Sequence, residues 1–408
     1  MALIVQKYGG SSVADAEKIK NVAHRIIATK EKGNQVVVVA SAMGKTTDEL
    51  ISLARQVTEQ PDERELDVLL STGEAVSSTL LAMALKSLGH DAISLSGAQA
   101  GIRTDAAYSR ARILTVEAHR IVKELGEGKI VIVAGFQGIT QDMDITTLGR
   151  GGSDTTAVAT AASLGAEICE IYTDVEGVYT ADPHLIPQAR KLKELSYEEM
   201  LELAAYGAKV LHPRSVELGE LFNIPILVAS SFTESPGTLI HGGIPMEVHS
   251  KVRGIAHDLD VAKITVLGVP DQPGIATAIF EPLAKENISI DTIVQNASVE
   301  RITDLTFTVA KSDLDKAMRV VEPVTKSIGA RGCIADAKLG KISIIGTGMQ
   351  NTPGYAARMF SALYEQGINI ELITTSEIRI TCIIDQSRVE DALIALHKAF
   401  ELEKGDGI

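Results

Sequence analysis

The sequence predicts an α/β protein, with a buried, mainly parallel sheet in its first half and two copies of a smaller α+β unit after it. In the first half, short β-branched runs alternate with segments of helical periodicity, which is typical of a parallel sheet covered by helices on both faces. From residue 263 onward, two segments resemble each other. A chain of 408 residues is too long for one ordinary core, so two or three domains are expected.

Six strands and the helices between them are expected in the first half. The strands are predicted at 3–6, 35–40, 92–95, 129–134, 167–173 and 226–229, with helices at 16–27, 66–70 and 76–88. The last two helical segments are predicted to form one region broken near Gly73. Ligands bind such sheets beyond the carboxyl ends of the strands, so the polar segments that follow strands are candidate sites.

The two copies of the repeat begin at Lys263 and Lys341, and each is expected to run strand, helix, strand, strand, helix. The first copy ends with a fourth strand, 333–337, which the second lacks. A strand-like segment at 252–257 precedes the first copy, and we hypothesise that it completes the sheet of the second. The expected domains are 1–245, a linker with that extra strand at 246–262, the first repeat at 263–338 and the second at 339–408.

Composition argues against several classes of function. A net charge of −14 without a run of Lys and Arg is unlike a nucleic-acid-binding protein. The longest apolar runs, 36–40 and 130–134, are far shorter than the roughly 20 residues that span a membrane, and the amino terminus is unlike a signal peptide. Three scattered cysteines fit a reducing compartment, and nine histidines show no metal-ligand pair. We expect a cytoplasmic protein with no membrane, nucleic-acid or zinc partner.

Two polar segments follow the first two strands. In KYGGSS, from Lys7, glycines let backbone N–H groups approach a phosphate and Lys7 adds a positive charge, although a tight turn with a solvated lysine explains the pattern equally well. In SAMGKTT, from Ser41, Val39 stands where a Walker A loop needs glycine, which excludes that motif. Ser41 and Thr47 remain as hydroxyls at the mouth of a strand, where helix capping is the simpler role.

The most specific local signal is TTLGRGGSD, residues 146–154, ahead of an alanine-rich helix. Arg150 can bind a carboxylate through two parallel hydrogen bonds, and Ser153 and Asp154 can cap the helix or contact a ligand. A flexible capped loop does not explain an arginine between glycines, so a binding function is favoured. In STGEA, Glu74 can accept hydrogen bonds from a substrate ammonium, or it can make a favourable contact with a helix amino terminus.

Another strand leads into YTDVEGVYTADP, residues 172–183, whose Thr, Asp and Tyr side chains can hold a nucleotide, although turn chemistry alone also produces such a sequence. In this order, KYGGSS, SAMGKTTD, STGEA, AGFQG, TTLGRGGSDTTA and YTDVEGVYTADP resemble the aspartate kinases of the amino-acid-kinase family, and KVLHPRSVE fits the same pattern. The repeats resemble the paired ACT domains of those enzymes. The resemblance covers essentially the whole chain.

That resemblance implies a three-layer amino-acid-kinase fold followed by two βαββαβ ACT domains. It also implies a reaction that uses ATP and Mg²⁺, in which the γ-phosphoryl group passes to the side-chain carboxylate of L-aspartate as the first step toward lysine, threonine and methionine. The attacking carboxylate is already ionised at neutral pH, so no general base is needed. Catalysis then rests on in-line positioning and on neutralising charge at the phosphoryl oxygens.

The resemblance assigns roles to individual residues. The expected catalytic residues are Lys7, at the transferring phosphoryl group, and Asp154, which organises that lysine. Aspartate is expected to contact Ser41, Thr47, Glu74, Arg150, Gly151, Gly152 and Ser153, with Arg150 on a carboxylate and Glu74 near the amino group. ATP is expected to contact Lys7, Tyr8, Gly9, Gly10, Thr173, Asp174, Tyr179, Asp182 and Lys209.

The repeats are expected to bind lysine, threonine or both as feedback effectors, as the family does. In each copy a strand leads to Pro-Gly at a helix start, where free N–H groups can bind the carboxylate of an amino acid. The expected contacts are Asp271, Gln272, Gly274, Asp291, Thr292, Ile293 and Gln295 in the first copy, and Asn351, Pro353, Asn369, Ile370, Ser376 and Glu377 in the second. Alternatively, the repeats only build an interface. Sheet edges that need covering predict a homodimer or a larger homo-oligomer.

Two other functions stay open at the level of the sequence. A related enzyme of the same fold would act on glutamate, acetylglutamate or carbamate, and the GRGGSD and TDVEGVYTADP segments argue against it, as do the repeats. A catalytically inactive amino-acid sensor on the same scaffold is the second alternative. The intact Lys7, Glu74, Arg150 and Asp154 argue against a sensor of that kind.

Overall fold

The computed structural model describes residues 2–208, 210–243, 252–296, 301–349 and 352–404. The chain divides into two compact units, the first made of Met1–Tyr179 and Lys191–Pro245 and the second of Thr180–Arg190 and Met246–Ile408. A short segment from within the first part of the sequence thus belongs to the second unit. No pattern in the sequence indicated that Thr180–Arg190 belongs to the second unit.

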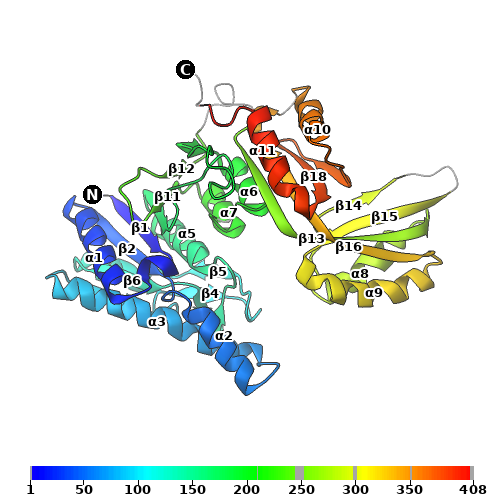
Figure 1. Ribbon diagram of the computed structural model, residues 1–408. Helices are drawn as coiled ribbons and strands as arrows, with labels where there is room; N and C mark the ends of the chain where they lie inside the picture. Colours follow the sequence, from blue (N-terminus) through cyan, green and yellow to red (C-terminus); the bar gives the residue numbers. More distant parts are fainter. Residues whose placement is uncertain (1, 209, 244–251, 297–300, 350–351, 405–408) are drawn as a thin grey trace. The chain divides into compact units, whose positions relative to one another are not determined.

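An eight-stranded sheet forms the centre of the first unit (Figure 1). Its strands are β1 (Leu3–Tyr8), β2 (Gln35–Ala40), β3 (Ala92–Leu95), β6 (Ile130–Ala134), β9 (Ile168–Thr173), β10 (Glu194–Leu195), β11 (Ile226–Ser230) and β12 (Thr238–Ile240), in the spatial order β10-β12-β11-β9-β1-β2-β6-β3. The pairs are parallel except for β11 with β12. The mainly parallel class and the six predicted strands are confirmed.

Helices cover both faces of this sheet. They are α1 (Ala16–Glu31), α2 (Thr46–Val57), α3 (Glu63–Ser87), α4 (His119–Gly126), α5 (Gly152–Leu164), α6 (Tyr197–Ala205) and α7 (Pro213–Leu221). Residues of α1 and α3 pack on one face against Val36 and Val38 of β2. Successive side chains of a strand point to opposite faces, so Val39 and Lys7 point to the other face, on which α5 lies.

A second, smaller sheet of the first unit was not predicted. It has the order β5-β4-β7-β8 and consists of β4 (Ile102–Thr104), β5 (Ile113–Val116), β7 (Gln137–Ile139) and β8 (Ile145–Thr147). Strands of three or four residues are too short to show a periodic pattern, which is why the sequence did not reveal them. The sheet matters for function because β8 ends just before the loop that carries Arg150.

The predicted break near Gly73 is wrong, because α3 is one continuous helix. A Cβ built at Gly73 would stand 2.9 Å from the Cβ of Ala42, so close packing against the loop after β2 requires the glycine. Glu74 therefore lies in the interior of a helix. The alternative explanation of Glu74 as a partner of a helix amino terminus is excluded.

Among the described helices, α3 is long and apolar enough to cross a membrane by length and composition alone. Half of the window that meets this criterion is buried inside the structure, as is also found in core helices of soluble proteins. Leu81 and Leu85 of α3 belong to the core that includes Val36 and Val38. The packing thus accounts for the apolar character of the helix.

The second unit is a single six-stranded sheet with helices (Figure 1). Its elements are β13 (Gly254–Pro270), α8 (Ile275–Lys285), β14 (Ile293–Gln295), β15 (Ile302–Val309), α9 (Leu314–Ser327), β16 (Gly332–Ile345), α10 (Tyr355–Glu365), β17 (Leu372–Thr375), β18 (Arg379–Asp385) and α11 (Val389–Ala399). The strand order is β14-β15-β13-β16-β18-β17. The α+β class predicted for the repeats is confirmed.

Two long strands, β13 and β16, each serve both repeats. The first residues of β13, 254–258, pair antiparallel with 341–345 at the end of β16, and its later residues pair with β15 of the first repeat. The predicted boundaries after residues 262 and 338 therefore fall inside continuous strands. A backbone connection of this kind makes the two repeats one sheet.

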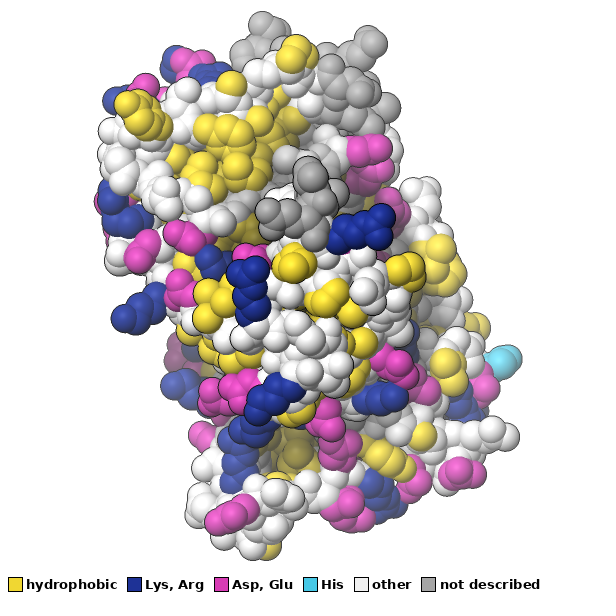
Figure 2. All heavy atoms as spheres, turned by 90° about the vertical axis from the view of Figure 1, so that its right-hand side faces the viewer, with side chains coloured by type: hydrophobic (Ala, Val, Ile, Leu, Met, Phe, Trp, Pro, Cys, Tyr) yellow, Lys and Arg dark blue, Asp and Glu magenta, His cyan; other side chains and the backbone are white. Residues whose placement is uncertain are grey.

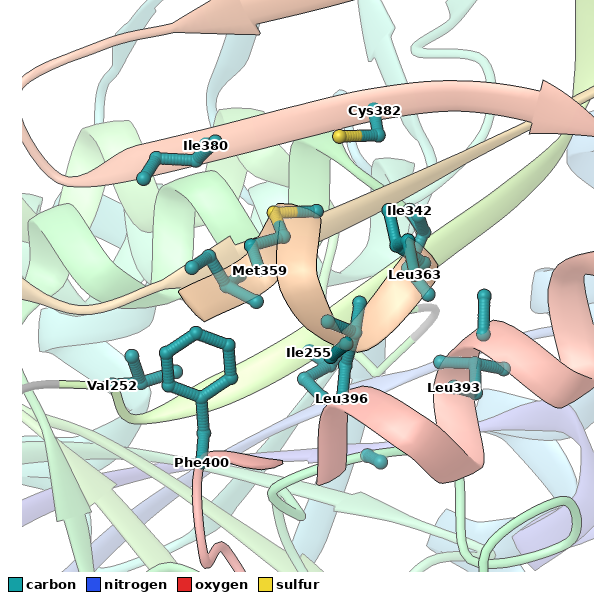
Figure 3. Packing of buried hydrophobic residues seen from close by; sticks show 14 of the residues in the cluster. Val252, Ile255, Ile342, Met359, Leu363, Ile380, Cys382, Leu393, Leu396 and Phe400 are labelled. Carbon is teal, nitrogen blue, oxygen red and sulfur yellow. The ribbon is translucent and has the colours of Figure 1, made fainter. Parts of the chain in front are cut away.

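The core of the second repeat contains residues from outside the repeat. Val252 and Ile255, which precede or begin β13, lie among Met359, Leu396 and Phe400 (Figure 3). Burial of such side chains contributes roughly 1.5 to 3 kcal/mol each. The second repeat thus depends on a segment that comes before the first repeat in the sequence.

The segment Thr180–Arg190 also belongs to this core, because Ala181 and Ile186 are buried in it. The carbonyl of Thr180 accepts a hydrogen bond from the N–H of Ile255 at 2.7 Å, and its hydroxyl lies 3.1 Å from Nε2 of His397 on α11. In the first unit, Tyr179 and Lys191 form an antiparallel bridge where the segment leaves and returns.

Candidate active site

A cavity of about 540 Å³ lies at the carboxyl ends of β1 and β2 in the first unit. It gathers all the residues predicted for catalysis or for aspartate, namely Lys7, Ser41, Thr47, Glu74, Arg150, Gly151, Gly152, Ser153 and Asp154. Parallel strands end at one edge of a sheet, which brings the carboxyl ends of β1 and β2 together there, while α3 supplies Glu74 and the loop after β8 supplies Arg150. A cavity of this size is typical of small-molecule sites.

Lys7 and Asp154 form an ion pair in this cavity. The Nζ of Lys7 lies 2.6 Å from Oδ1 of Asp154, and the two side chains are 12% and 11% exposed. The pair forms because Lys7 points from β1 toward α5, whose first turn carries Asp154. An ammonium has three donors, so Lys7 can hold Asp154 and still donate to an anionic ligand.

Glu74 presents a buried carboxyl group to the cavity. Only 3% of its surface is exposed, and Oε1 accepts a hydrogen bond from the N–H of Ala42 at 3.1 Å. Its Oε2 has no hydrogen-bond partner within the described part of the chain. Burial raises the pKa of Glu74 to about 7, against the opposing effect of two backbone hydrogen bonds. A buried acceptor without a partner in a cavity marks a place where a ligand can donate a hydrogen bond.

Arg150 is exposed at the cavity, and no ion pair to it is found among the described residues. Its neighbour Gly151 precedes α5 with φ of 68°, and a Cβ there would stand 2.2 Å from the Cβ of His212. Only glycine fits this backbone and this contact. Because Gly151 occupies the capping position and no side chain caps α5, Ser153 and Asp154 do not cap the helix. Their predicted alternative, contact with a ligand, agrees with their place in the cavity.

The residues predicted to bind ATP lie in different surroundings. Gly9 and Gly10 follow β1, Gly10 lines the cavity, and the N–H of Gly9 donates to the carbonyl of Tyr172 at 3.1 Å. Thr173 is the last residue of the adjacent parallel strand β9 and Asp174 follows it, and the hydroxyl of Thr173 donates to Oδ1 of Asp174 at 3.0 Å. These two strand ends therefore lie side by side at the edge of the sheet that holds the cavity.

Four further predicted ATP contacts have other settings. The side chain of Tyr8 is fully buried, its ring stacks on Tyr172, and its carbonyl accepts a hydrogen bond from the N–H of Ser41 at 3.1 Å. Tyr179 is partly buried. Asp182 belongs to the second unit and accepts a hydrogen bond from the N–H of His184. Lys209 lies outside the described residues.

The residues predicted for an effector lie in turns and at strand ends of the second unit. Asp271, Gln272 and Gly274 stand between β13 and α8; Asp291, Thr292, Ile293 and Gln295 stand at β14; Pro353 precedes α10; Asn369 and Ile370 follow it; Ser376 and Glu377 join β17 to β18. Asp291 forms an ion pair with Lys341. Gly274 and Gly354 precede α8 and α10 with φ of 92° and 105°, without a side-chain cap. Asn351 lies outside the described residues.

Several cavity residues carried no role in the sequence analysis. They are Asp48, Ile51, Leu66, Leu70, Ser109, Phe136, Thr147 and Gly149. Ser109 comes from a loop without a recognisable motif, and its φ of 64° is unusual for a residue with a side chain. Among the described residues, no three His, Cys, Asp or Glu side chains come together as a metal-binding group.

The chain is similar to known proteins over its whole length. The model of the amino acid kinase family matches residues 2–230, and an ACT domain model matches residues 264–323 and 342–400. The aspartokinase of Mycolicibacterium smegmatis is 52% identical over 412 residues, which cover all of this chain and 98% of that protein. The aspartokinase of Corynebacterium glutamicum is 51% identical, covering 98% of this chain and 97% of its own length.

Solved structures of an aspartokinase are also similar to this chain. A crystal structure of E. coli aspartokinase III in complex with aspartate and ADP, described as the R-state, has a TM-score of 0.84 at 25% identity and covers 97% of this chain and 99% of its own. A structure of the same enzyme with lysine and aspartate, described as the T-state, has a TM-score of 0.75 at 25% identity, covering 98% and 99%.

Proposed function

The chain belongs to the aspartokinases of the amino acid kinase family, and we propose that it phosphorylates the side-chain carboxylate of L-aspartate with ATP to form 4-phospho-L-aspartate. One observation carries the proposal: a single cavity holds the Lys7–Asp154 pair, a buried carboxyl with a free oxygen at Glu74, and a guanidinium at Arg150. These are the groups that an amino acid with two carboxylates and a phosphoryl donor require. The E. coli enzyme has been solved with aspartate and ADP.

The charges of the cavity match those of aspartate. Arg150 binds a carboxylate through two parallel hydrogen bonds, and Oε2 of Glu74 accepts one from the ammonium. Together they orient the side-chain carboxylate as the nucleophile, so positioning supplies most of the catalysis. Ser41 and Thr47 line the same cavity and offer hydroxyl donors. Lys7 stabilises charge on the transferred phosphoryl group, and Asp154 holds its ammonium in place.

The donor set also fits a nucleotide with Mg²⁺. The backbone N–H group of Gly10, which lines the cavity, and the Lys7 ammonium suit phosphate oxygens. When bound with a nucleotide, Mg²⁺ takes phosphate oxygens, water and one or two carboxylates, and it neutralises phosphoryl charge. Asp154 in the cavity and Asp174 at the end of β9 are carboxylates of the required kind. Thr173 and Tyr179 are proposed nucleotide contacts on the same segment.

The test is the formation of acyl phosphate from L-aspartate with ATP and Mg²⁺, trapped with hydroxylamine. Turnover with aspartate supports the proposal. Turnover with glutamate, acetylglutamate or carbamate in its place would move the enzyme to a sibling activity. Amino-acid binding without turnover of ATP would leave an inactive sensor. In the cell, we propose, this reaction is cytoplasmic and is the first step toward lysine, threonine and methionine.

We propose in addition that the second unit binds lysine, threonine or both and thereby regulates the kinase. Supporting observations are the two uncapped helix starts at Gly274 and Gly354 and the lysine complex of the E. coli enzyme. Regulation requires two states that differ in affinity for the effector. A rise in the aspartate concentration needed for half saturation, on addition of lysine or threonine, is the expected result; unchanged kinetics with both would reduce the unit to an element of assembly.

The second unit is also the proposed site of homodimer or higher assembly. Its sheet ends in β14 and β17, and isoleucines are exposed on it, among them Ile302 at 43% and Ile334 at 57%. In the register of the sheet, Ile334 pairs with Thr265, on the face opposite the core residue Ile264. On the face shown in Figure 2, hydrophobic side chains gather near the upper end, while Lys and Arg mix with Asp and Glu elsewhere. Such surfaces favour association with another protein chain rather than with nucleic acid.

A further inference from the structure

Asp67 is a fully buried carboxylate on α3, two turns before Glu74, and it lies behind the wall of the active-site cavity. Its Oδ2 accepts the backbone N–H of Ser109 at 2.9 Å and that of Thr147 at 2.8 Å. Its Oδ1 accepts the hydroxyl of Thr147 at 2.6 Å. Both partners line the cavity, whereas Asp67 does not. A buried charge is tolerated only with such a set of donors.

Arg214, at the start of α7, binds backbone carbonyl groups that lie close in sequence to Ser109 and Thr147, the two partners of Asp67. Its Nη1 donates to the carbonyl of Leu148 at 2.7 Å and its Nη2 to the carbonyl of Ala111 at 3.0 Å. Arg214 belongs to KVLHPRSVE, a segment in which the resemblance to aspartate kinases assigned a role only to Lys209. The guanidinium suits this task because its donors are held in a rigid fork.

Asp67 and Arg214 therefore bind the same two segments, 109–111 and 147–148. Asp67 accepts hydrogen bonds from them, and Arg214 donates hydrogen bonds to them. The carboxylate satisfies N–H groups of both segments and the guanidinium satisfies carbonyls of both. The segments are also joined directly, by the N–H of Ala111 and the carbonyl of Thr147 at 2.9 Å. Ser109 keeps its positive φ within this network, a conformation that persists only where the surroundings enforce it.

We infer that Asp67 and Arg214 are positioning residues that set the place of Arg150, and hence the affinity for the aspartate carboxylate. Arg150 follows Leu148 by two residues, so a shift of the held segment moves the guanidinium directly. The carboxyl-binding end of the site is thus fixed by two residues that do not touch substrate. This inference rests on the proposed function, because it names the group of the substrate that the positioned arginine binds.

The test compares Asp67→Asn and Arg214→Gln with the wild-type full-length chain. Asparagine keeps the shape of Asp67 but removes its charge and replaces one acceptor oxygen by an N–H₂ group, and glutamine at position 214 removes the two parallel donors of the guanidinium. Each variant is expected to weaken aspartate binding, measured by calorimetry without nucleotide, by at least about tenfold, because a buried charged hydrogen bond is lost. The KM for ATP is expected to change less than about twofold. The matched control is Asp62→Asn, an exposed aspartate that caps the same helix.

A second readout separates positioning from general loss of structure. Backbone hydrogen exchange of peptides covering 104–112 and 145–151 should become faster in both variants, while exchange in β1, β2 and β9 stays as in wild type. In the double variant, the loss of affinity should be smaller than the product of the two single losses, since both act on one network. Thr147→Val, which removes only the hydroxyl donor, supplies a milder variant if Asp67→Asn does not fold.

The outcomes are distinct. Faster exchange in the two segments together with weaker aspartate binding supports the inference. Aspartate affinity within twofold of wild type in every folded variant overturns it, as does an equal loss of aspartate and ATP affinity. If the wild-type protein binds and phosphorylates a different carboxylate, the proposed function fails, whereas the exchange data and the affinity for that other carboxylate still decide whether the network positions Arg150.

Discussion

Glu74 shows at the scale of one residue how burial sets chemistry. Its pKa of about 7 lies above the ordinary value because the folded protein disfavours its charge. The folded state therefore keeps the proton at a pH where the unfolded chain has lost it. Consequently Glu74 makes the protein less stable as pH rises from about 4.5 to about 7, the reverse of a salt-bridged carboxylate.

The same group should make aspartate binding depend on pH. The ionised carboxylate is the form that attracts the ammonium, so affinity for aspartate is expected to rise up to about tenfold between about pH 6 and about pH 8. Glu74→Gln should bind more weakly and show a flat profile over this range. Calorimetry at several pH values measures both. A profile in the glutamine variant as steep as in wild type would assign the dependence to another group.

Substitutions of Lys7 and Arg150 should affect different steps, the first mainly catalysis and the second mainly the binding of aspartate. Lys7→Ala is expected to lower kcat by about a hundredfold or more, since it removes charge stabilisation at the phosphoryl group. Arg150→Ala is expected to raise the KM for aspartate by a similar factor with a smaller effect on kcat. Steady-state kinetics of the trapped acyl phosphate distinguishes the two, and the reverse pattern would contradict the assignment.

Gly73 allows a test of whether close packing or helix propensity decides which residue is stable at this position of α3. Alanine is the better helix former, yet a Cβ at this position meets Ala42, so Gly73→Ala is expected to destabilise the protein by about 1 to 3 kcal/mol. The matched control is Gly126→Ala in the last turn of α4, where a Cβ meets nothing within 4 Å; it should be neutral or stabilising by up to about 1 kcal/mol. Thermal unfolding of both variants gives the comparison, and equal behaviour would refute the packing argument.

At the scale of elements, the start of β13 is the part on which the second repeat depends. Ile255 is 3% exposed and lies in the core of that repeat, so Ile255→Ala is expected to cost about 2 to 5 kcal/mol. Ile394→Ala on α11, where the side chain is 53% exposed, is the control and should cost little. Hydrogen exchange should become faster in α10 and α11 and remain unchanged in α8 and α9. Uniformly faster exchange would mean that the two repeats unfold as one.

At the scale of the molecule, the exposed isoleucines on the sheet of the second unit predict that copies of the chain associate. Ile334→Asp should lower the mass of the particle in sedimentation, because a charge on an apolar contact is costly to bury. The control is Ile394→Asp, which changes a similarly exposed isoleucine on helix α11 and is expected to leave the mass unchanged. An unaltered mass in both variants would place the interface elsewhere.

Much of the fold followed from local pattern. Strands such as Gln35–Ala40 are uniformly apolar and α1 is clearly periodic, so the parallel sheet and its helices could be predicted. The duplicated Pro-Gly segments likewise predicted the repeats. The small sheet of β4, β5, β7 and β8 could not be predicted, because its strands are too short to show a period.

The sequence by itself determined the candidate site residues, because the motifs that hold Lys7, Glu74, Arg150 and Asp154 could each be recognised locally, and the structure brings all four residues to one cavity. Only the tertiary structure decided that α3 runs unbroken through Gly73, that Thr180–Arg190 joins the second unit, and that Asp67 and Arg214 hold the loop before Arg150. The physical reason is the range of the interactions. Periodicity and strand ends are local, whereas close packing and buried hydrogen bonds join residues that no local pattern relates.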